Sequence, residues 1–173
     1  MFRIHRGLDL PISGAPAQDI DTGPAVSRVA LVGDDYVGMN PKMAVQVGDS
    51  VKQGQVLFED KKTPGVQFTS PGCGKVVAVN RGAKRKFESM VIELAGEEEE
   101  TFPSFSASEL DNLERDRVQE LLIQSGMWTV LRTRPYSKVP VPNSAPHSIF
   151  VTAMDTNPLA ADPVIIINQR ADD

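Results

Sequence analysis

Cysteine and histidine are scarce in this sequence, which limits the metal and redox chemistry that the chain can support. Its 173 residues include one cysteine, Cys73, and two histidines, His5 and His147. A single thiol cannot form an internal disulfide, an iron–sulfur site or a zinc site of the CxxC kind, and the histidines lack the spacing of paired metal ligands. We therefore predict no metal site, and no residue stands out as a catalytic acid, base or nucleophile.

Long apolar runs and an excess of positive charge are also missing. No run approaches the roughly 20 residues that a membrane-spanning helix needs, and the opening residues MFRIHRGLDLPI lack the apolar core of a signal peptide. The formal net charge is −5 and the pI is near 5.1, whereas nucleic-acid-binding proteins usually carry a basic excess. We therefore expect a cytoplasmic protein with no nucleic-acid partner, able to reach a membrane by docking to other subunits.

Short runs rich in valine and other β-branched residues fill the first hundred residues. They span 26–34, 42–49, 54–60, 65–71, 74–80 and 89–94. Turn pairs such as Pro71-Gly72 separate them, and short strands at this spacing predict a small barrel or sandwich. The charged and then Pro/Ser-bearing stretch 97–106 marks a junction, so we predict one domain at 1–100 and a second at 101–173.

Helix signals dominate the residues that follow the junction. Ser106-x-x-Glu109 has the form of a capping box, although Asn112 or Glu114 could mark the helix start instead. Apolar residues at helical spacing continue to Gly126, a natural C-terminal stop. The pattern therefore predicts a helix that ends at Gly126.

Two apolar segments near the end of the sequence, 148–155 and 163–168, predict strands. The second contains four successive apolar residues, which fits a strand covered on both faces, as in a parallel sheet flanked by helices. The first turns of another element are the alternative. Such a strand needs more neighbours than the remaining residues supply, so we infer part of a larger α/β domain.

The stretch VGDSVKQGQVLFEDKKTPGVQFTSPGCGKVVAV resembles the lipoyl/biotinyl-type barrel-sandwich domain. In carriers of that family a lysine at the hairpin tip bears the cofactor, and Lys61 and Lys62 lie near the tip here. The methionine-lysine-methionine and Asp-Lys-Ala modification motifs are absent. A carrier modified at Lys61 or Lys62 is one interpretation, and a solvated or docking tip, which shares the fold without the chemistry, is the other.

A second resemblance covers essentially the whole chain. The segments GLDLPISG, YVGM, GQVLFEDKK, SGMWTVLRTRPYSKVP and SIFVTAMDTNPLAADP resemble, in this order, the A subunits of bacterial Na⁺-translocating NADH–quinone reductases. The resemblance implies a peripheral subunit at the cytoplasmic face of the inner membrane, in a complex that oxidises NADH, reduces ubiquinone and moves Na⁺. Its partners would be the other subunits of that complex and ubiquinone.

That family is similar in architecture to the flavin-binding subunit of respiratory complex I. The resemblance implies an α+β chain, with a lipoyl-like barrel-sandwich followed by the start of a Rossmann-like α/β domain. In the flavin-binding relatives a glycine-rich segment follows the helix and approaches the flavin phosphate. Here the segment 125–136 keeps only Gly126, and bulky side chains replace the other glycines. We therefore expect this chain to bind no cofactor, with NADH and flavins elsewhere in the complex.

The stretch QSGMWTVLRTRPYSKVP concentrates cations and aromatic rings. Arg132 and Arg134 would share a face on an extended loop, and guanidinium groups suit anions or carbonyl oxygens. Trp128 and Tyr136 offer flat faces with polar edges. A quinone head group needs both, so we predict a quinone-facing or partner-facing surface. Its candidate residues are Tyr36, Gly38, Met39, Trp128, Arg132, Arg134, Tyr136 and Lys138.

Each part of this candidate surface has a structural alternative. Tyr36 lies in LVGDDYVGM, which either borders the same cleft as 131–138, between barrel and α/β domain, or forms a polar loop between strands. The arginines either contact a ligand or bond to carboxylates such as Asp155 and to loop carbonyls, while Trp128 fills the core. A purely structural scaffold protein is the corresponding alternative for function.

Overall fold

The computed structural model of the protein describes residues 13–152 and 159–169. They fall into two compact units. One is Val26–Ala145, and the other combines 13–25 with 146–152 and 159–169. The domain boundary at residue 100 stays a prediction.

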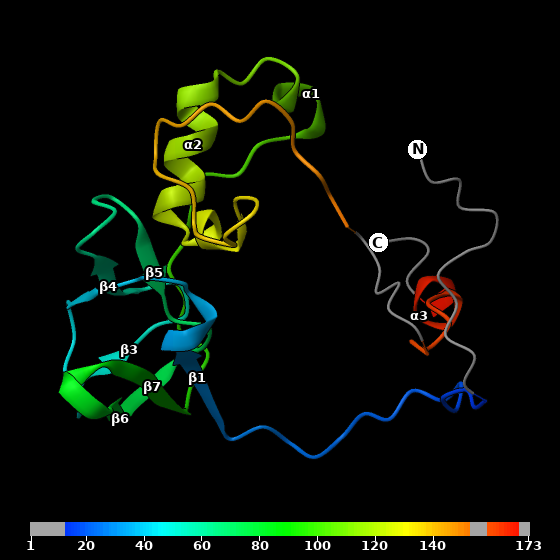
Figure 1. The fold of residues 1–173 in the computed structure, drawn as a ribbon, viewed down its shortest axis with the longest axis horizontal. Coiled ribbons are helices and arrows are strands. Elements are labelled where there is room, and N and C mark those ends of the chain that lie inside the picture. Colours follow the sequence, from blue (N-terminus) through cyan, green and yellow to red (C-terminus); the bar gives the residue numbers. More distant parts are fainter. Residues whose placement is uncertain (1–12, 153–158, 170–173) are drawn as a thin grey trace, which may run out of the picture. The chain divides into compact units, whose positions relative to one another are not determined.

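Two antiparallel sheets form the barrel-sandwich part of the unit Val26–Ala145 (Figure 1). The first sheet has the order β1-β7-β6-β3, with β1 at Arg28–Val32, β7 at Phe87–Leu94, β6 at Gly74–Arg81 and β3 at Ser50–Val51. The second has the order β2-β4-β5, with β2 at Pro41–Met43, β4 at Val56–Asp60 and β5 at Gln67–Thr69. Six of the seven strands lie in the predicted runs. The run 42–49 is wrong beyond β2, and the short strand β3 was missed.

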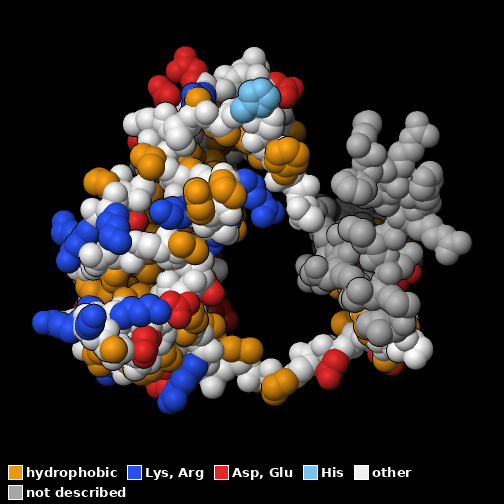
Figure 2. Space-filling view, viewed as in Figure 1, with side chains coloured by type: hydrophobic (Ala, Val, Ile, Leu, Met, Phe, Trp, Pro, Cys, Tyr) orange, Lys and Arg blue, Asp and Glu red, His pale blue; other side chains and the backbone are white. Residues whose placement is uncertain are grey.

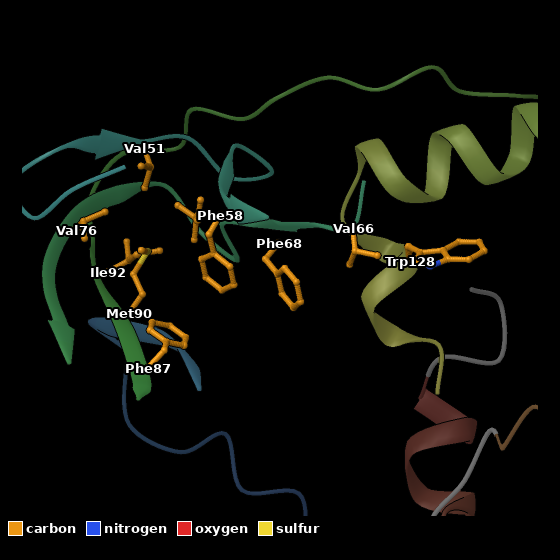
Figure 3. Close-up of a cluster of buried hydrophobic side chains, with 10 residues drawn as sticks. Val51, Phe58, Val66, Phe68, Val76, Phe87, Met90, Ile92 and Trp128 are labelled. Carbon is orange, nitrogen blue, oxygen red and sulfur yellow. The ribbon is translucent and has the colours of Figure 1, made fainter. Parts of the chain in front are cut away.

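The hydrophobic core lies between these sheets (Figure 3). The side chains of Leu57 and Phe58 are fully buried, and the ring of Phe58 stacks on that of Phe68 with centroids 4.8 Å apart. Phe87 meets Phe58 edge-on at 5.3 Å. Offset and edge-on pairs are the favoured geometries for aromatic rings, so this cluster fixes how the two sheets pack.

The helices follow the barrel in the sequence. The first, α1 at Ala107–Leu110, starts at the predicted capping box, where the Ser106 N–H donates to Glu109 Oε2 at 2.7 Å. The second, α2 at Arg115–Gln124, starts from the other predicted position, Glu114. Its end at Gly126 is confirmed, since this residue has φ of +77° and opens the 3₁₀ turn η3 at Met127–Val130.

Residues 163–168, predicted as a buried strand, belong to a short helix instead, α3 at Val164–Gln169. The Asp162 carboxylate accepts the Val164 N–H at 3.0 Å, and Asp-Pro before an apolar run is itself a helix-start signal. The side chain of Ile166 is 60% exposed. In the segment predicted as a strand at 148–155, residues 148–152 form none, and the rest lies outside the described residues.

The helices of the described residues are all short. Across 13–152 and 159–169, none of them is long and apolar enough to cross a bilayer.

Candidate functional site

The candidate site begins at Tyr36, which the loop after β1 places against the core. This loop starts with the 3₁₀ turn η1 at Gly33–Asp35, closed by the Tyr36 N–H donating to the Gly33 carbonyl at 3.2 Å. A side chain at Gly33 would collide with the backbone carbonyl of Phe87, so glycine lets the loop lie directly on β7. The Tyr36 ring is partly buried and meets Phe68 edge-on at 4.7 Å.

The segment after α2 brings an arginine onto the other side of this tyrosine. Arg132 Cζ lies 5.2 Å from the centroid of the Tyr36 ring, within the range of a cation–π contact. Its Nη1 donates to the backbone carbonyls of Thr129 and, at 3.1 Å, Leu131. The structure therefore brings together Tyr36 and Arg132, two candidate residues 96 positions apart.

The electrostatic environment of the Tyr36 hydroxyl follows from this packing. Burial raises its pKa above the ordinary value of 10.0, and the neighbouring Asp35 carboxylate adds to the rise. The Arg132 guanidinium and a hydrogen bond with Thr129 lower the pKa and partly oppose burial. Tyr36 is therefore a neutral hydrogen-bond donor at physiological pH.

Trp128 follows the structural alternative. Its side chain is 7% exposed and belongs to the core cluster, and its indole N–H donates to the Pro140 carbonyl at 2.9 Å. Figure 3 shows its ring together with the other buried side chains. A buried ring whose only donor is occupied fills the core and cannot offer a free face to a ligand.

The remaining candidates of this stretch lie on a tight loop. The N–H and the hydroxyl of Thr133 both donate to the Lys138 carbonyl, at 2.8 and 3.1 Å. A turn occupies 134–136, so the extended geometry that would align Arg132 with Arg134 is absent. Tyr136 at this turn is 73% exposed, and Arg134 and Lys138 are exposed beside it.

Three of the predicted residues, Tyr36, Gly38 and Met39, line a hollow of about 530 Å³. The sequence analysis missed its other side. Five cationic residues, Lys62, Arg81, Lys84, Arg85 and Lys86, also line it. The available signal was the basic run at 84–86 directly after the Arg81-Gly82 turn pair; this run was interpreted only as a turn. Arg132 and the 134–138 loop do not line this hollow.

The lysines of the carrier interpretation lie on the turn between β4 and β5. Both Lys61 and Lys62 are exposed, while their backbone N–H groups are tied down, Lys61 to the Asn40 carbonyl at 2.8 Å and Lys62 to Asp60 Oδ1 at 3.0 Å. The turn thus presents two free ammonium groups on a fixed backbone.

Comparison with known families agrees with this architecture. Residues 2–95 match the NqrA N-terminal barrel-sandwich hybrid domain, and residues 113–173 match the NqrA second alpha/beta domain. The predicted fold class, a barrel-sandwich followed by α/β structure, is therefore confirmed.

Individual relatives are similar over almost the whole chain. The protein is 60% identical over 172 residues to the A subunit of the Na(+)-translocating NADH-quinone reductase of Vibrio vulnificus (strain YJ016), an alignment that covers 99% of this chain and 39% of the relative. It is 59% identical over 172 residues to the corresponding protein of Vibrio anguillarum, with the same coverage. The corresponding protein of Saccharophagus degradans is 58% identical over 171 residues, covering 99% of this chain and 38% of the relative. The chain thus spans about two fifths of the length of these curated relatives. It belongs to the family of the A subunits of Na⁺-translocating NADH–quinone reductases.

Proposed function

We propose that this chain works in a membrane NADH:ubiquinone reductase that pumps Na⁺, as a peripheral part that contacts ubiquinone or the membrane subunits. Its support at the level of the complex is the similarity to relatives named as the A subunit of that enzyme. Its place is the cytoplasmic face of the bacterial inner membrane, and its partners are the other subunits of the complex. It has no redox centre of its own.

The observation that carries the contact with quinone is the pairing of Tyr36 with Arg132. A quinone head group is a flat ring with two carbonyl oxygens, so it binds best beside an aromatic or apolar surface that also supplies hydrogen-bond donors. Tyr36 supplies a neutral hydroxyl. A guanidinium has five N–H donors, and within the described part of the chain the recorded bonds of Arg132 use Nη1 alone.

The folding of the segment 125–136 supports the absence of a flavin phosphate site. A backbone cradle needs space beside its N–H groups, but a Cβ at Gly126 would collide with the side chain of Thr69, and Trp128 packs into the core directly after it. We expect the purified chain to show no visible flavin absorbance. A flavin spectrum that persists after denaturation and refolding would contradict this expectation.

A titration with short-chain ubiquinone tests the proposal. Trp128 is the only tryptophan, and it lies four residues before Arg132, so its emission reports on a ligand at this position. We expect saturable quenching in the wild-type chain and weaker binding in Tyr36→Phe and Arg132→Ala. Loss of one hydrogen bond corresponds to roughly tenfold weaker binding.

Arg117→Gln is the matched control, because Arg117 is an exposed arginine on α2 that pairs with Glu120. It should bind quinone as the wild type does. A linear response that is identical in all four proteins would refute quinone contact at this position and leave docking to the membrane subunits as the role of the arginine segment.

Intact mass separates this function from the carrier alternative. A lipoyl or biotinyl group on Lys61 or Lys62 would add a discrete mass increment that disappears in the double substitution to arginine. We expect the mass of the unmodified chain, 18.8 kDa.

A further inference from the structure

The hollow beside Tyr36 carries a concentration of positive charge that the proposed quinone contact does not use. Its five lysine and arginine residues come from the β4–β5 turn, from β6 and from the β6–β7 hairpin. They face one lining carboxylate, that of Asp34, which is paired with Lys86. The whole chain has a net charge of −5, so this local excess opposes the overall balance. Figure 2 shows lysine and arginine side chains gathered over the barrel side of the molecule.

The hairpin that bears three of these cations has an unfavourable backbone. Lys84 and Arg85 have φ of +54° and +61°, and the turn is closed by the Lys86 N–H donating to the Ala83 carbonyl at 3.1 Å. Two successive left-handed residues define the type I′ hairpin turn, which favours Asn-Gly because other side chains are strained there. Lys-Arg at these positions is costly to the fold, and such strain in a native structure points to a function.

The opposite wall of the hollow is fixed by a buried carboxylate. Asp60 is 8% exposed, and its Oδ1 accepts two backbone N–H groups, from Asn40 at 2.9 Å and from Lys62 at 3.0 Å. Both of these residues line the hollow. Lys62 is therefore attached to an ordered backbone.

The shape and the apolar part of the lining suit a small ligand rather than an extended chain. Sites for small molecules are concave, within about 300–1,000 Å³, and combine apolar surface with a few polar groups. The 530 Å³ hollow includes Met39 and Phe87 among its lining residues. Several cations around one concavity match a group with several acceptor oxygens and more than one negative charge.

We propose that this hollow binds a phosphate group, carried either by a soluble phosphate ester or by an anionic lipid headgroup. The proposal stands independently of the quinone contact, because it rests on residues of the barrel alone. Attraction between these cations and the phosphate must weaken as salt screens it.

The test combines two probes with a variant whose effects on binding and on stability have opposite signs. Pyrophosphate binding is measured by calorimetry at low and high salt. Vesicles of phosphatidylglycerol mixed with phosphatidylcholine are compared with pure phosphatidylcholine by co-sedimentation. The double variant Lys84→Asn/Arg85→Gly installs the favoured turn, so it should raise the Tm by roughly 2–8 °C and weaken binding at least about tenfold.

Two further variants complete the experiment. Lys62→Gln removes a cation from a different element and should also weaken binding. Lys52→Gln/Lys75→Gln removes two exposed lysines outside the hollow and should leave binding unchanged. Binding of pyrophosphate but not of vesicles identifies a soluble ester, and the reverse identifies a headgroup. The proposal is overturned if neither probe binds, if the turn variant binds as the wild type does, or if the Lys52/Lys75 control loses as much affinity.

Discussion

The hydroxyl of Thr69 donates a hydrogen bond to the carbonyl oxygen of Ser125, 3.2 Å away, and so joins barrel strand β5 to the end of α2. The approach is close enough that a Cβ on the next residue, Gly126, would collide with the Thr69 side chain. Gly126 also has φ of +77°. A glycine is therefore required here for two separate reasons, conformation and space.

Substitution of Gly126 by alanine should destabilise the protein by about 2–4 kcal/mol, since it combines left-handed strain with a steric clash. Gly38→Ala is the matched control, because Gly38 has φ of +81° and open space around its Cα. It should cost only the strain, about 1–2 kcal/mol. Urea unfolding measures both, and equal losses would show that the contact with Thr69 is loose.

The pKa of Tyr36 should respond to Arg132. Burial is the main cause of its rise above 10.0, and the Arg132 charge opposes that rise, so Arg132→Ala should raise the pKa further. The sequence has two tyrosines, and a Tyr136→Phe background leaves Tyr36 as the only one. Ultraviolet titration of the phenolate then gives its pKa directly. An unchanged or lower value in Arg132→Ala would refute the cation–π contact in solution.

The same raised pKa makes stability depend on pH in the alkaline range. The folded state favours the protonated phenol, so the contribution is fully present below the unfolded pKa near 10 and is lost as the pH rises through the higher folded pKa. We expect the free energy of unfolding to fall above pH 10 more steeply in the wild type than in Tyr36→Phe. Parallel curves for the two proteins would contradict this.

The local signals of the sequence predicted secondary structure best where one residue type has one physical role. The pattern Ser106-x-x-Glu109 predicted the first helix correctly because the bonds that it forms are local. The apolar run at 163–168 failed because four successive apolar residues fit a strand and a helix equally well. The decisive residue was Asp162, whose carboxylate accepts the Val164 N–H and whose role was not weighed.

The candidate site divides in the same way. The pairing of Tyr36 with the arginine segment was predicted from residue chemistry, and the structure brings Tyr36 and Arg132 together. The basic hollow was not predicted, because its cations are spread over residues 62–86 and only the barrel topology gathers them. The role of Trp128 could not be decided, since a tryptophan beside arginines fits a ligand surface and a core equally well.

Trp128→Phe should destabilise the protein by about 1–3 kcal/mol. The substitution removes buried ring volume and leaves the Pro140 carbonyl without its indole donor. Tyr136→Phe is the control, because that side chain is 73% exposed and should change stability by no more than about 0.5 kcal/mol. Guanidinium unfolding followed by circular dichroism compares them, and equal small effects would mean that Trp128 is not a core residue in solution.

Asp60 should matter more to stability than other carboxylates of the barrel, because its buried Oδ1 satisfies two backbone N–H groups at once. Asp60→Ala leaves the N–H groups of Asn40 and Lys62 without their acceptor and should cost about 1–3 kcal/mol. Asp60→Asn keeps an oxygen in this position and should cost less. Asp49→Ala provides a comparison, since Asp49 is less buried and accepts a single N–H, from Gln46 at 2.9 Å. Urea unfolding should therefore rank the losses with Asp60→Ala largest, and a loss for Asp49→Ala as large as that for Asp60→Ala would show that burial of the carboxylate adds nothing.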